Sequence, residues 1–303
     1  MIGVEVFVMT VKILLDTDLG SDIDDAVALA YLLAQPEADL LGVTTVSGQS
    51  HLRAQMVDAL CQAAGRDVPI LPGVEAPLLV ENRQPLAQQA LKLADWPHRT
   101  HFPERTAVDF LAEQILAHPG EVILLTIGPL TNIALLFALY PATVAALGQL
   151  VMMCGAFTPQ PDNPWKAEWN ALLDPHATEM VYRAPVRVHR SVGLDVTRQV
   201  TLSAGEVRER FRHPLLAPVL DFSEVWFREQ DRMFFHDPLA AVSIFDPGVC
   251  SFTAGRVAVN SDASAGLLGR TDFDPDAEHK PHEVALAVDP ERFFASYFKV
   301  FEP

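Results

Sequence analysis

Residues 122–161 constrain the fold more than any other part of this sequence, because these forty residues include no charged residue and no histidine. By length alone, such a segment is long enough to contain a membrane-spanning helix. Glycines and prolines interrupt it, however, and Asn132 would lack a hydrogen-bond partner in hydrocarbon. Divided at these residues, the segment predicts a strand at 122–127, a helix, and a second strand at 150–154. Uncharged strands of this kind are typical of a parallel sheet with helices on both faces.

Strand and helix patterns alternate along the rest of the chain. Apolar runs predict further strands at residues 13–15, 40–46, 70–71, 186–194, 256–259 and 284–288. Helical periods are expected between the early strands, at residues 25–34, 52–64 and 107–118. This order predicts an α/β fold, a single Rossmann-like domain whose mainly parallel central sheet is flanked by helices. We expect residues 1–303 to form that domain, with an N-terminal extension at 1–11 and a helical insertion at 202–245, in the C-terminal third.

Charge and cysteine content restrict the partners of the protein. Lysine and arginine number 22 against 39 aspartates and glutamates, and the net charge of −17 repels nucleic acids and anionic membranes. Cys61, Cys154 and Cys250 lie far apart and outside any metal-binding motif, which favours a reducing location. The first twelve residues lack the features of a signal peptide, and Met9 is an alternative start to Met1. We therefore expect a cytoplasmic protein with no nucleic-acid or membrane partner.

Five aspartates follow the first predicted strand within ten residues: Asp16, Asp18, Asp22, Asp24 and Asp25. Carboxylates so close together repel one another unless a cation lies among them. Carboxylate oxygens suit Ca²⁺ or Mg²⁺, and the absence of a nearby histidine or cysteine argues against zinc. Capping of the following helix is an alternative role for one or two of the five. The cluster as a whole predicts a site for a hard divalent metal ion.

Several motifs occur in a fixed order along the chain. The first is an Asp-x-Asp pair, Asp16 and Asp18, followed by Gly20 and by Asp24-Asp25-Ala26. The others lie at residues 42–48, 127–134, 153–157, 167–170 with 174–175, and 236–240. With this set of motifs, the chain resembles the inosine-uridine-preferring nucleoside hydrolase family. Two more residues separate the aspartate pairs than in the commonest form of the family's motif, which leaves the ligand role of Asp22 open.

The resemblance implies a calcium-dependent enzyme that hydrolyses the N-glycosidic bond of ribonucleosides to ribose and free base. It implies that Asp18, Asp25, Asp237 and the main-chain carbonyl of Ile127 bind the Ca²⁺, which activates a water molecule. In that scheme Asp18 is also the general base, His236 protonates the leaving base, and the transition state is oxocarbenium-like. The substrate-binding residues that it implies are Asp24, Gln49, Met153, Asn163, Glu168, Trp169 and Asn170. Members of the family are commonly oligomers, so we expect a homodimer or homotetramer.

Several of these assignments have a structural alternative. Asp-Pro occurs five times in the chain and is a favourable helix start, so capping is the alternative role of Asp237. His236 titrates near neutrality and suits a proton donor, but a buried structural histidine is its alternative. Glu168 and Asn170 would point the same way as residues i and i+2 of an extended segment, and a solvated loop is the alternative there.

Other positions leave the preference for a nucleobase open. Gln49 stands where much of the family has asparagine, and its longer side chain alters the expected sugar contact. Trp165, Trp169 and Trp226 are candidates to stack on a base. The polar segment 82–106 is expected to be a long mobile loop near the site. The sequence therefore predicts neither purine nor pyrimidine specificity.

Two other functions fit parts of the sequence. An Asp-x-Asp pair after the first strand of a Rossmann-like fold also resembles Mg²⁺-dependent haloacid dehalogenase-like phosphatases. The adjacent Asp24-Asp25 and His236-Asp237 pairs fit that family poorly. A non-catalytic riboside-binding protein that retains the metal site is the second alternative, and it predicts ligand binding without release of a reducing sugar.

Overall fold

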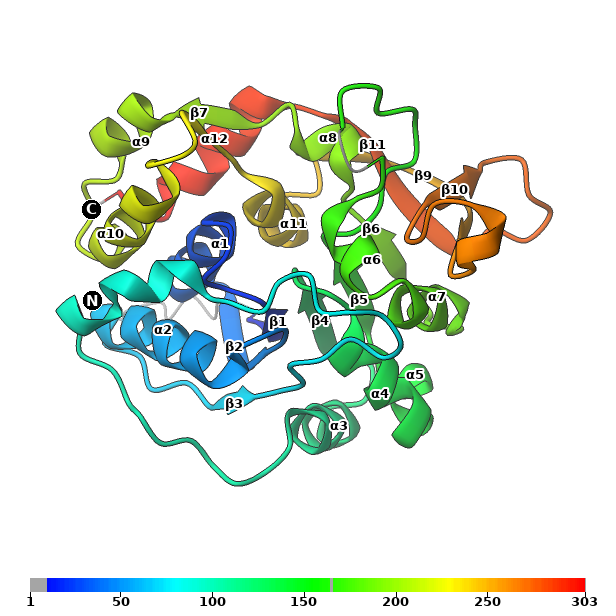
Figure 1. The fold of residues 1–303 in the computed structure, drawn as a ribbon, viewed down its shortest axis with the longest axis horizontal. Coiled ribbons are helices and arrows are strands. Elements are labelled where there is room, and N and C mark those ends of the chain that lie inside the picture. The colour runs from blue at the N-terminus through cyan, green and yellow to red at the C-terminus, as the bar shows by residue number, and fades with distance from the viewer. Residues whose placement is uncertain (1–9, 164–165, 303) are drawn as a thin grey trace, which may run out of the picture.

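A nine-stranded sheet forms the middle of the molecule, in the order β10-β9-β11-β6-β5-β4-β1-β2-β3 (Figure 1). The computed structural model describes residues 10–163 and 166–302, so Trp165 lies outside the described residues. The strands of the sheet are β1 (Val11–Thr17), β2 (Ala38–Thr45), β3 (Ile70–Pro72), β4 (Val122–Thr126), β5 (Gln149–Met152), β6 (His189–Ser191), β9 (Cys250–Val259), β10 (Thr271–Asp274) and β11 (His282–Val288). All neighbouring pairs are parallel except those of β9 with β10 and β11. The predicted α/β fold with a mainly parallel central sheet is confirmed.

Helices cover both faces of the sheet (Figure 1). One face packs against α1 (Asp24–Ala34), α2 (Ser50–Ala63), α10 (Leu216–Trp226), α11 (His236–Phe245) and α12 (Pro290–Lys299). The other packs against α3 (Ala107–Ala117), α4 (Thr131–Leu139) and α7 (Pro175–Arg183). Side chains of a strand alternate between the two cores, as in β1, where Ile13 and Leu15 enter the first and Leu14 the second. Because both faces of the middle strands are buried, their central residues are apolar, as in residues 13–15 of β1 and 122–125 of β4.

Shorter elements connect these layers. They are α5 (Ala142–Ala146), α6 (Trp169–Leu173), α8 (Leu194–Thr197), α9 (Ala204–Arg210) and the 3₁₀ helices η1 (Gln88–Asp95) and η2 (Ala263–Ala265). In addition, β7 (Thr201–Ser203) and β8 (Arg232–Phe234) form a separate antiparallel pair. The segment 202–245 is thus mainly helical, as predicted, with α9, α10 and α11, and it includes most of this pair. Among residues 10–163 and 166–302, no helix combines the length and apolar character needed to span a bilayer.

Some predicted boundaries are wrong. The strand expected at 186–194 is only β6, because the chain turns into α8 at Leu194, whose N–H donates to the carbonyl of Gly155. Strand β10 was not predicted, since it is short, lies at the edge of the sheet and includes two aspartates. The expected N-terminal extension, residues 1–11, falls mostly outside the described residues, and β1 begins at Val11.

The strand order reverses between β1 and β4. The chain proceeds from β1 outward to β2 and β3 and then crosses back to β4, which pairs with β1 in parallel. At such a reversal the connections leave the carboxyl ends of the two strands in opposite directions, which opens a site for a ligand. Asp18 comes directly after β1 and Ile127 directly after β4. Two of the sequence motifs therefore meet at this edge of the sheet.

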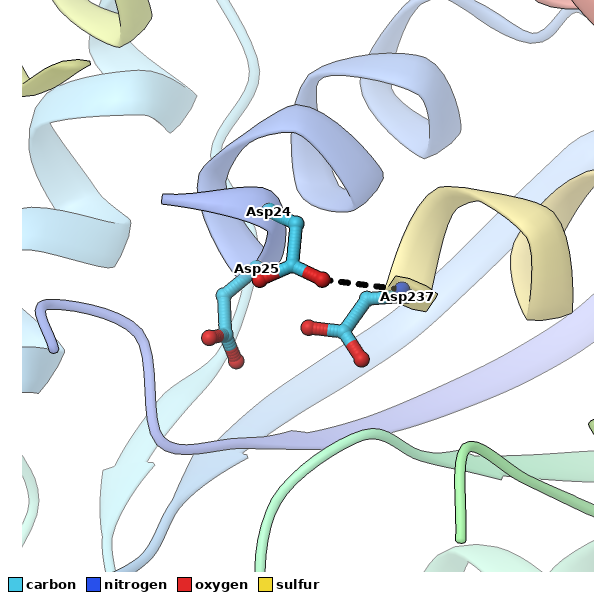
Figure 2. Close-up of side chains that lie close together, drawn as sticks. All are labelled: Asp24, Asp25 and Asp237. Carbon is cyan, nitrogen blue, oxygen red and sulfur yellow. Dashed lines mark hydrogen bonds between the residues drawn. The ribbon is translucent and has the colours of Figure 1, made fainter. Parts of the chain in front are cut away.

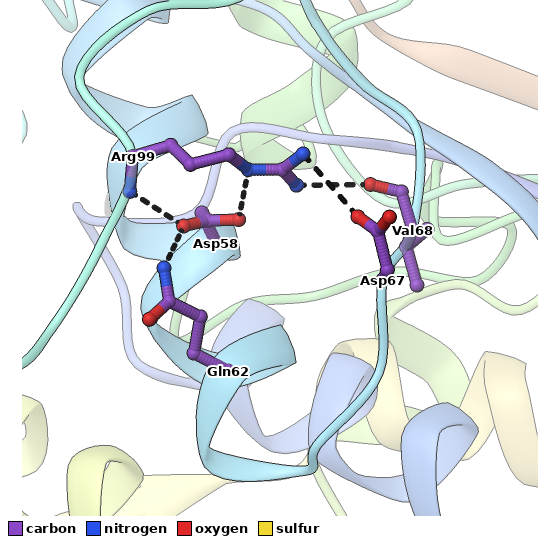
Figure 3. A network of polar contacts seen from close by, with 5 residues as sticks. All are labelled: Asp58, Gln62, Asp67, Val68 and Arg99. Atoms are coloured by element: carbon purple, nitrogen blue, oxygen red, sulfur yellow. Dashed lines mark hydrogen bonds and ion pairs between the residues drawn. The ribbon is translucent and has the colours of Figure 1, made fainter.

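The segment 82–106 is attached to the body of the protein. Its 3₁₀ helix η1 packs against α2 and α10. Beyond η1, Arg99 joins α2 to the residues that precede β3 in the network of Figure 3. Its main-chain N–H and its Nε donate to the two carboxylate oxygens of Asp58, each at 2.6 Å, and its guanidinium reaches Asp67 and the carbonyl of Val68. The loop that we expected is therefore anchored at its far end.

Candidate active site

Three buried aspartates face one another at the N-termini of α1 and α11 (Figure 2). Asp24 and Asp25 are the first residues of α1, and Asp237 is the second residue of α11. One carboxylate oxygen of each lies within 4.8 Å of the others. Asp24 Oδ2 also accepts a hydrogen bond from the main-chain N–H of Asp237, at 3.2 Å. Residues 213 positions apart thus form one group, which we call the acidic cluster.

None of the three aspartates of the acidic cluster is the N-cap residue of its own helix. The N-cap residue of α1 is Ile23 and that of α11 is Phe235, and neither makes a side-chain capping bond. Asp174 and Asp289, by contrast, cap α7 and α12 and are each followed by proline. The capping alternative for Asp237 is therefore wrong.

Electrostatics make the acidic cluster unfavourable without a cation. Burial raises the pKa of each of the three carboxyl groups, and repulsion from neighbouring aspartates raises the pKa further. A divalent cation favours the ionised forms and offsets that repulsion. The donor set consists of carboxylate oxygens, which Ca²⁺ and Mg²⁺ prefer. Close by in the sequence, burial raises the pKa of Asp16 to about 7, and its Oδ2 has no hydrogen-bond partner among the described residues. These residues fit a hard divalent cation.

Asp18 lies beside the acidic cluster, at the end of β1. Burial raises its pKa, while the charge of Arg53 and a hydrogen bond from Gln84 to Oδ2 oppose that shift. Its charge in turn raises the pKa of Asp25 and Asp237. Gly128, just beyond β4, packs closely on Asp18, because a Cβ there would lie 2.8 Å from Asp18 Oδ1. A glycine is needed for the Asp18 carboxylate to approach the end of β4 so closely.

The side chain of Asn170 joins the ends of β4 and β5. Its Nδ2 donates to the carbonyl oxygens of Ile127, at 2.9 Å, and Met153, at 3.1 Å. A carbonyl oxygen has two lone pairs, so the Ile127 carbonyl can accept this bond and still contact a cation. Three residues that the sequence singled out are thereby in direct contact.

Glu168 has a different environment from the one expected. Helix α6 begins at Trp169, so the extended i and i+2 arrangement of Glu168 and Asn170 is wrong. Glu168 Oε1 accepts from the N–H of Asn170 at 2.7 Å, and Oε2 accepts from the N–H groups of Ala171 and Gly155 at 2.9 and 3.1 Å. Burial raises the pKa of Glu168, and these backbone donors oppose the shift. The helix forms here because the carboxylate satisfies main-chain donors of its first turn.

Gln84 was not predicted, although it bridges two predicted site residues. Its Nε2 donates to Asp18 Oδ2, and its Oε1 accepts from Trp169 Nε1 at 2.8 Å. The side chain is buried and belongs to the segment 82–106, so the expectation that this segment lies near the site is confirmed. Gln49 Oε1 accepts from the main-chain N–H of Ala87 at 2.8 Å, and its assignment to the sugar stays a prediction. The polar composition of residues 82–106 was the sequence signal that could have pointed to the contact between Gln84 and Asp18.

His236 begins α11, directly before Asp237. Its Nδ1 lies 2.7 Å from Thr197 Oγ1, and its ring stacks on Phe234 with 5.4 Å between centroids. Burial lowers the pKa of His236 to about 4, and the charge of Arg198 acts in the same direction. The ring is therefore uncharged at neutral pH in the metal-free protein.

Two candidate residues make local contacts. Asn163 Nδ2 donates to the carbonyl of Ala167 at 2.8 Å, within the loop that precedes α6. Asp22 Oδ1 accepts from the N–H of the next residue, Ile23, at 2.6 Å, and burial raises the pKa of Asp22 to about 7. The sugar-binding role of Asn163 stays a prediction, and the role of Asp22 stays open.

Comparison with known proteins identifies the family. The family described as inosine-uridine preferring nucleoside hydrolase matches residues 13–295. The chain belongs to this family. The inosine-uridine preferring nucleoside hydrolase of Leishmania major is 32% identical, covering 96% of this chain and 97% of its own. Uridine nucleosidase 1 of Arabidopsis thaliana is 29% identical, covering 92% of this chain and 90% of its own. A solved plant nucleoside hydrolase is 27% identical, with a TM-score of 0.83 over 96% of this chain and 99% of its own.

Family membership makes this nucleoside hydrolase an enzyme that hydrolyses N-glycosyl bonds. The haloacid dehalogenase-like phosphatase is thereby excluded. The names of the relatives mention different nucleosides: the Leishmania major name mentions inosine and uridine, and the Arabidopsis thaliana name mentions uridine alone. They therefore leave the nucleobase preference of this chain to experiment.

Proposed function

We propose that this protein hydrolyses the N-glycosidic bond of ribonucleosides to ribose and free base, and that it requires Ca²⁺. The observation that carries the proposal is the acidic cluster, with three buried carboxylates within 4.8 Å of one another. Like charges buried this close destabilise a fold unless a cation balances them. The position of Asp18 and Ile127 at the reversal of strand order supports the same site.

Asp18, Asp25, Asp237 and the carbonyl of Ile127 are the groups that would hold the cation. Asp24, whose carboxylate belongs to the same cluster, would border both the cation and the sugar. A bound divalent cation supplies Lewis-acid chemistry that lowers the pKa of a water molecule. Asp18 is the proposed general base, because burial raises its pKa and so makes it a better proton acceptor than a solvated aspartate. The hydrogen bond from Gln84 orients its carboxylate.

The acidic surroundings suit the proposed transition state. An oxocarbenium-like sugar carries positive charge, which nearby carboxylates stabilise electrostatically. Asn170 is proposed to bind the ribose, and Glu168 supports it by accepting the main-chain N–H of Asn170. The negative charge of the site also repels the phosphate of a nucleotide. Nucleosides are therefore the proposed substrates.

His236 is proposed to assist departure of the base. Its contact with Thr197 holds the ring at the start of α11, beside Asp237. A neutral imidazole donates a hydrogen bond through one nitrogen, whereas transfer of a full proton requires the protonated ring. With a pKa of about 4, the neutral ring predominates at pH 7.

The test is release of reducing sugar from ribonucleosides, 2′-deoxynucleosides and one nucleotide, with Ca²⁺ and with chelator. We expect ribose only from ribonucleosides and only with the metal. The D25N variant is the matched control, because it removes one charge of the acidic cluster and should abolish the calcium-dependent release. Calcium-dependent riboside binding without release of sugar from any substrate would refute the proposed activity on these ribonucleosides.

We also propose a homodimer or homotetramer and a cytoplasmic location. All three cysteines are free and buried, which supports a reducing compartment. Light scattering coupled to size-exclusion chromatography measures the oligomeric state directly, and a monomer at micromolar concentration would contradict that part of the proposal.

A further inference from the structure

Arg53, in α2, is completely buried and uses every N–H of its guanidinium. Nε donates to the carbonyl of Gly48 at 2.8 Å. Nη1 donates to the carbonyls of Asp18 and Leu19, the latter at 3.2 Å. Nη2 donates to Ser21 Oγ at 3.0 Å and to the carbonyl of Leu86 at 3.1 Å. Five donors thus meet four main-chain carbonyls and one hydroxyl.

These partners are unusual for a buried arginine, which normally pairs with a carboxylate. Arg53 lies close enough to Asp18 and Asp25 to interact with their charges, yet its five bonds go to neutral oxygens. The carboxylates beside it are therefore left available to a cation. A guanidinium that donates to several main-chain carbonyls fixes the conformation of the main chain around it, because its planar group presents N–H donors in several directions at once.

Arg53 connects two segments that carry the site. The first is the aspartate loop, residues 18–23, between β1 and α1. The second is the cover segment, residues 84–89, which includes Gln84. Further bonds join the same two segments: the N–H of Gln89 donates to the carbonyl of Gly20 at 3.0 Å, and Gln89 Nε2 donates to the carbonyl of Ser21 at 3.2 Å. The aspartate loop has no regular structure, and the cover segment enters η1 only at Gln88, so these bonds define how the two segments meet.

We propose that Arg53 is a positioning residue that fastens the aspartate loop to the cover segment, so that the carboxylates are arranged for a cation before it binds. The proposal rests on the proposed function of this site. The aspartate loop is two residues longer than the commonest form of the family motif, and Arg53 binds the carbonyls of two residues and the hydroxyl of a third within it. Fastening at those points removes the freedom that a longer loop would otherwise have.

The test compares R53K, R53M and the control R99M with the unmodified protein. Arg99 anchors the far end of segment 82–106 through bonds to Asp58, Asp67 and Val68, all outside the aspartate loop. One readout is Ca²⁺ affinity by calorimetry. The other is hydrogen–deuterium exchange of residues 84–89 in the metal-free protein. For both Arg53 variants we expect Ca²⁺ affinity to fall by about 10- to 100-fold, the usual effect of losing a group that orients ligands, and exchange to accelerate. R99M should keep its Ca²⁺ affinity within about threefold.

If Arg53 acted only through its positive charge, the Ca²⁺ affinities of the variants would differ from those expected above. Its positive charge repels a cation, so R53M would then bind Ca²⁺ as tightly as the unmodified protein or more tightly, and R53K would behave as unmodified. Either result overturns the proposal. If R53M fails to fold, R53K and S21A test the proposal in its place. S21A removes one hydrogen-bond partner of Arg53 Nη2, so it should accelerate exchange and weaken Ca²⁺ binding by a few fold.

The two proposals fail separately. Absence of sugar release from every nucleoside would refute the proposed hydrolysis and leave the Ca²⁺ affinities and exchange rates to decide the role of Arg53. If the unmodified protein binds no Ca²⁺, the metal assignment is wrong, and unchanged exchange in R53K would then refute the fastening itself.

Discussion

Replacing Asp237 by asparagine is expected to stabilise the metal-free protein and to abolish its stabilisation by calcium. Asp237 is 4% exposed, and burial together with the charges of Asp24 and Asp25 raises its pKa well above the ordinary value. Asparagine keeps the size of the side chain and removes the ionisable group. The substitution therefore isolates the electrostatic cost of one carboxyl group in the acidic cluster.

The size of the effect follows from proton linkage. A carboxyl group that is kept protonated by the fold costs about 1.36 kcal/mol for each pH unit above its unfolded pKa, here 3.8. At pH 7 the ceiling is about 4 kcal/mol, and relaxation and solvation reduce it to about 2–4 kcal/mol. Unfolding entropy of about 2.1 cal/mol/K per residue over 303 residues converts this to a rise in Tm of about 3–6 °C. Because the folded pKa is raised, the cost grows as pH rises, so the difference should vanish near pH 4.

The assay is thermal unfolding at several pH values, with chelator and with Ca²⁺. At 100 times its Kd, Ca²⁺ should stabilise the unmodified protein by about 2.7 kcal/mol, or roughly 4 °C, and D237N by much less. The control is D58N, the same substitution at a buried aspartate whose carboxylate accepts bonds from Arg99 and Gln62 (Figure 3). That variant should lose about 1–3 kcal/mol instead. Destabilisation of metal-free D237N at pH 7 would refute the electrostatic reasoning.

Three further predictions concern single groups. D18N should lose turnover by several orders of magnitude with an unchanged circular dichroism spectrum, because both a ligand charge and the base are removed; near-normal activity would remove Asp18 from the mechanism. H236A should lose more activity on inosine or uridine than on a p-nitrophenyl riboside, whose leaving group needs no proton, and equal losses would mean that His236 does not assist the base. Arg292 lowers the pKa of Asp246 to about 2. D246N should therefore have a lower free energy of unfolding than the unmodified protein at pH 6, and this difference should shrink as pH falls from about 4 to about 2; a difference in urea unfolding that is constant with pH would contradict this.

The fold was predictable where burial leaves a simple signal. Strands such as β1 and β4 lie between two layers of helices, so their residues are apolar on both sides and visible in the sequence. Strands β7, β8 and β10 have three or four residues each and include charged or hydroxyl side chains, so no periodicity can develop. The end of β6 depends on a hydrogen bond from Leu194 to Gly155, a contact that no local pattern contains.

The site was predictable to the extent that its residues lie in recognisable motifs. Asp24 and Asp25 are adjacent in the sequence, and their pairing with Asp237 depended on the family resemblance. Gln84 and Arg53 could not be predicted in this way, because each meets Asp18 across dozens of residues: Gln84 from an irregular segment, and Arg53 from α2. Glu168 was expected in an extended segment because a short helix such as α6 has too few residues to show a helical period.

The arrangement of the site explains how a fold tolerates so many buried carboxylates. The groups that surround them mostly bind main-chain atoms: Arg53 binds carbonyls, Glu168 binds N–H groups, and Gly128 permits close approach to Asp18. These bonds fix the conformation of the site, while burial and mutual repulsion hold the pKa of the three carboxyl groups of the acidic cluster above the ordinary value. The N-termini of α1 and α11 oppose part of that shift, because the N-terminal end of a helix carries partial positive charge and favours the ionised form. A divalent cation and a positively charged sugar in the transition state would favour ionisation of these groups, so the electrostatic cost borne by the metal-free protein would be offset on binding.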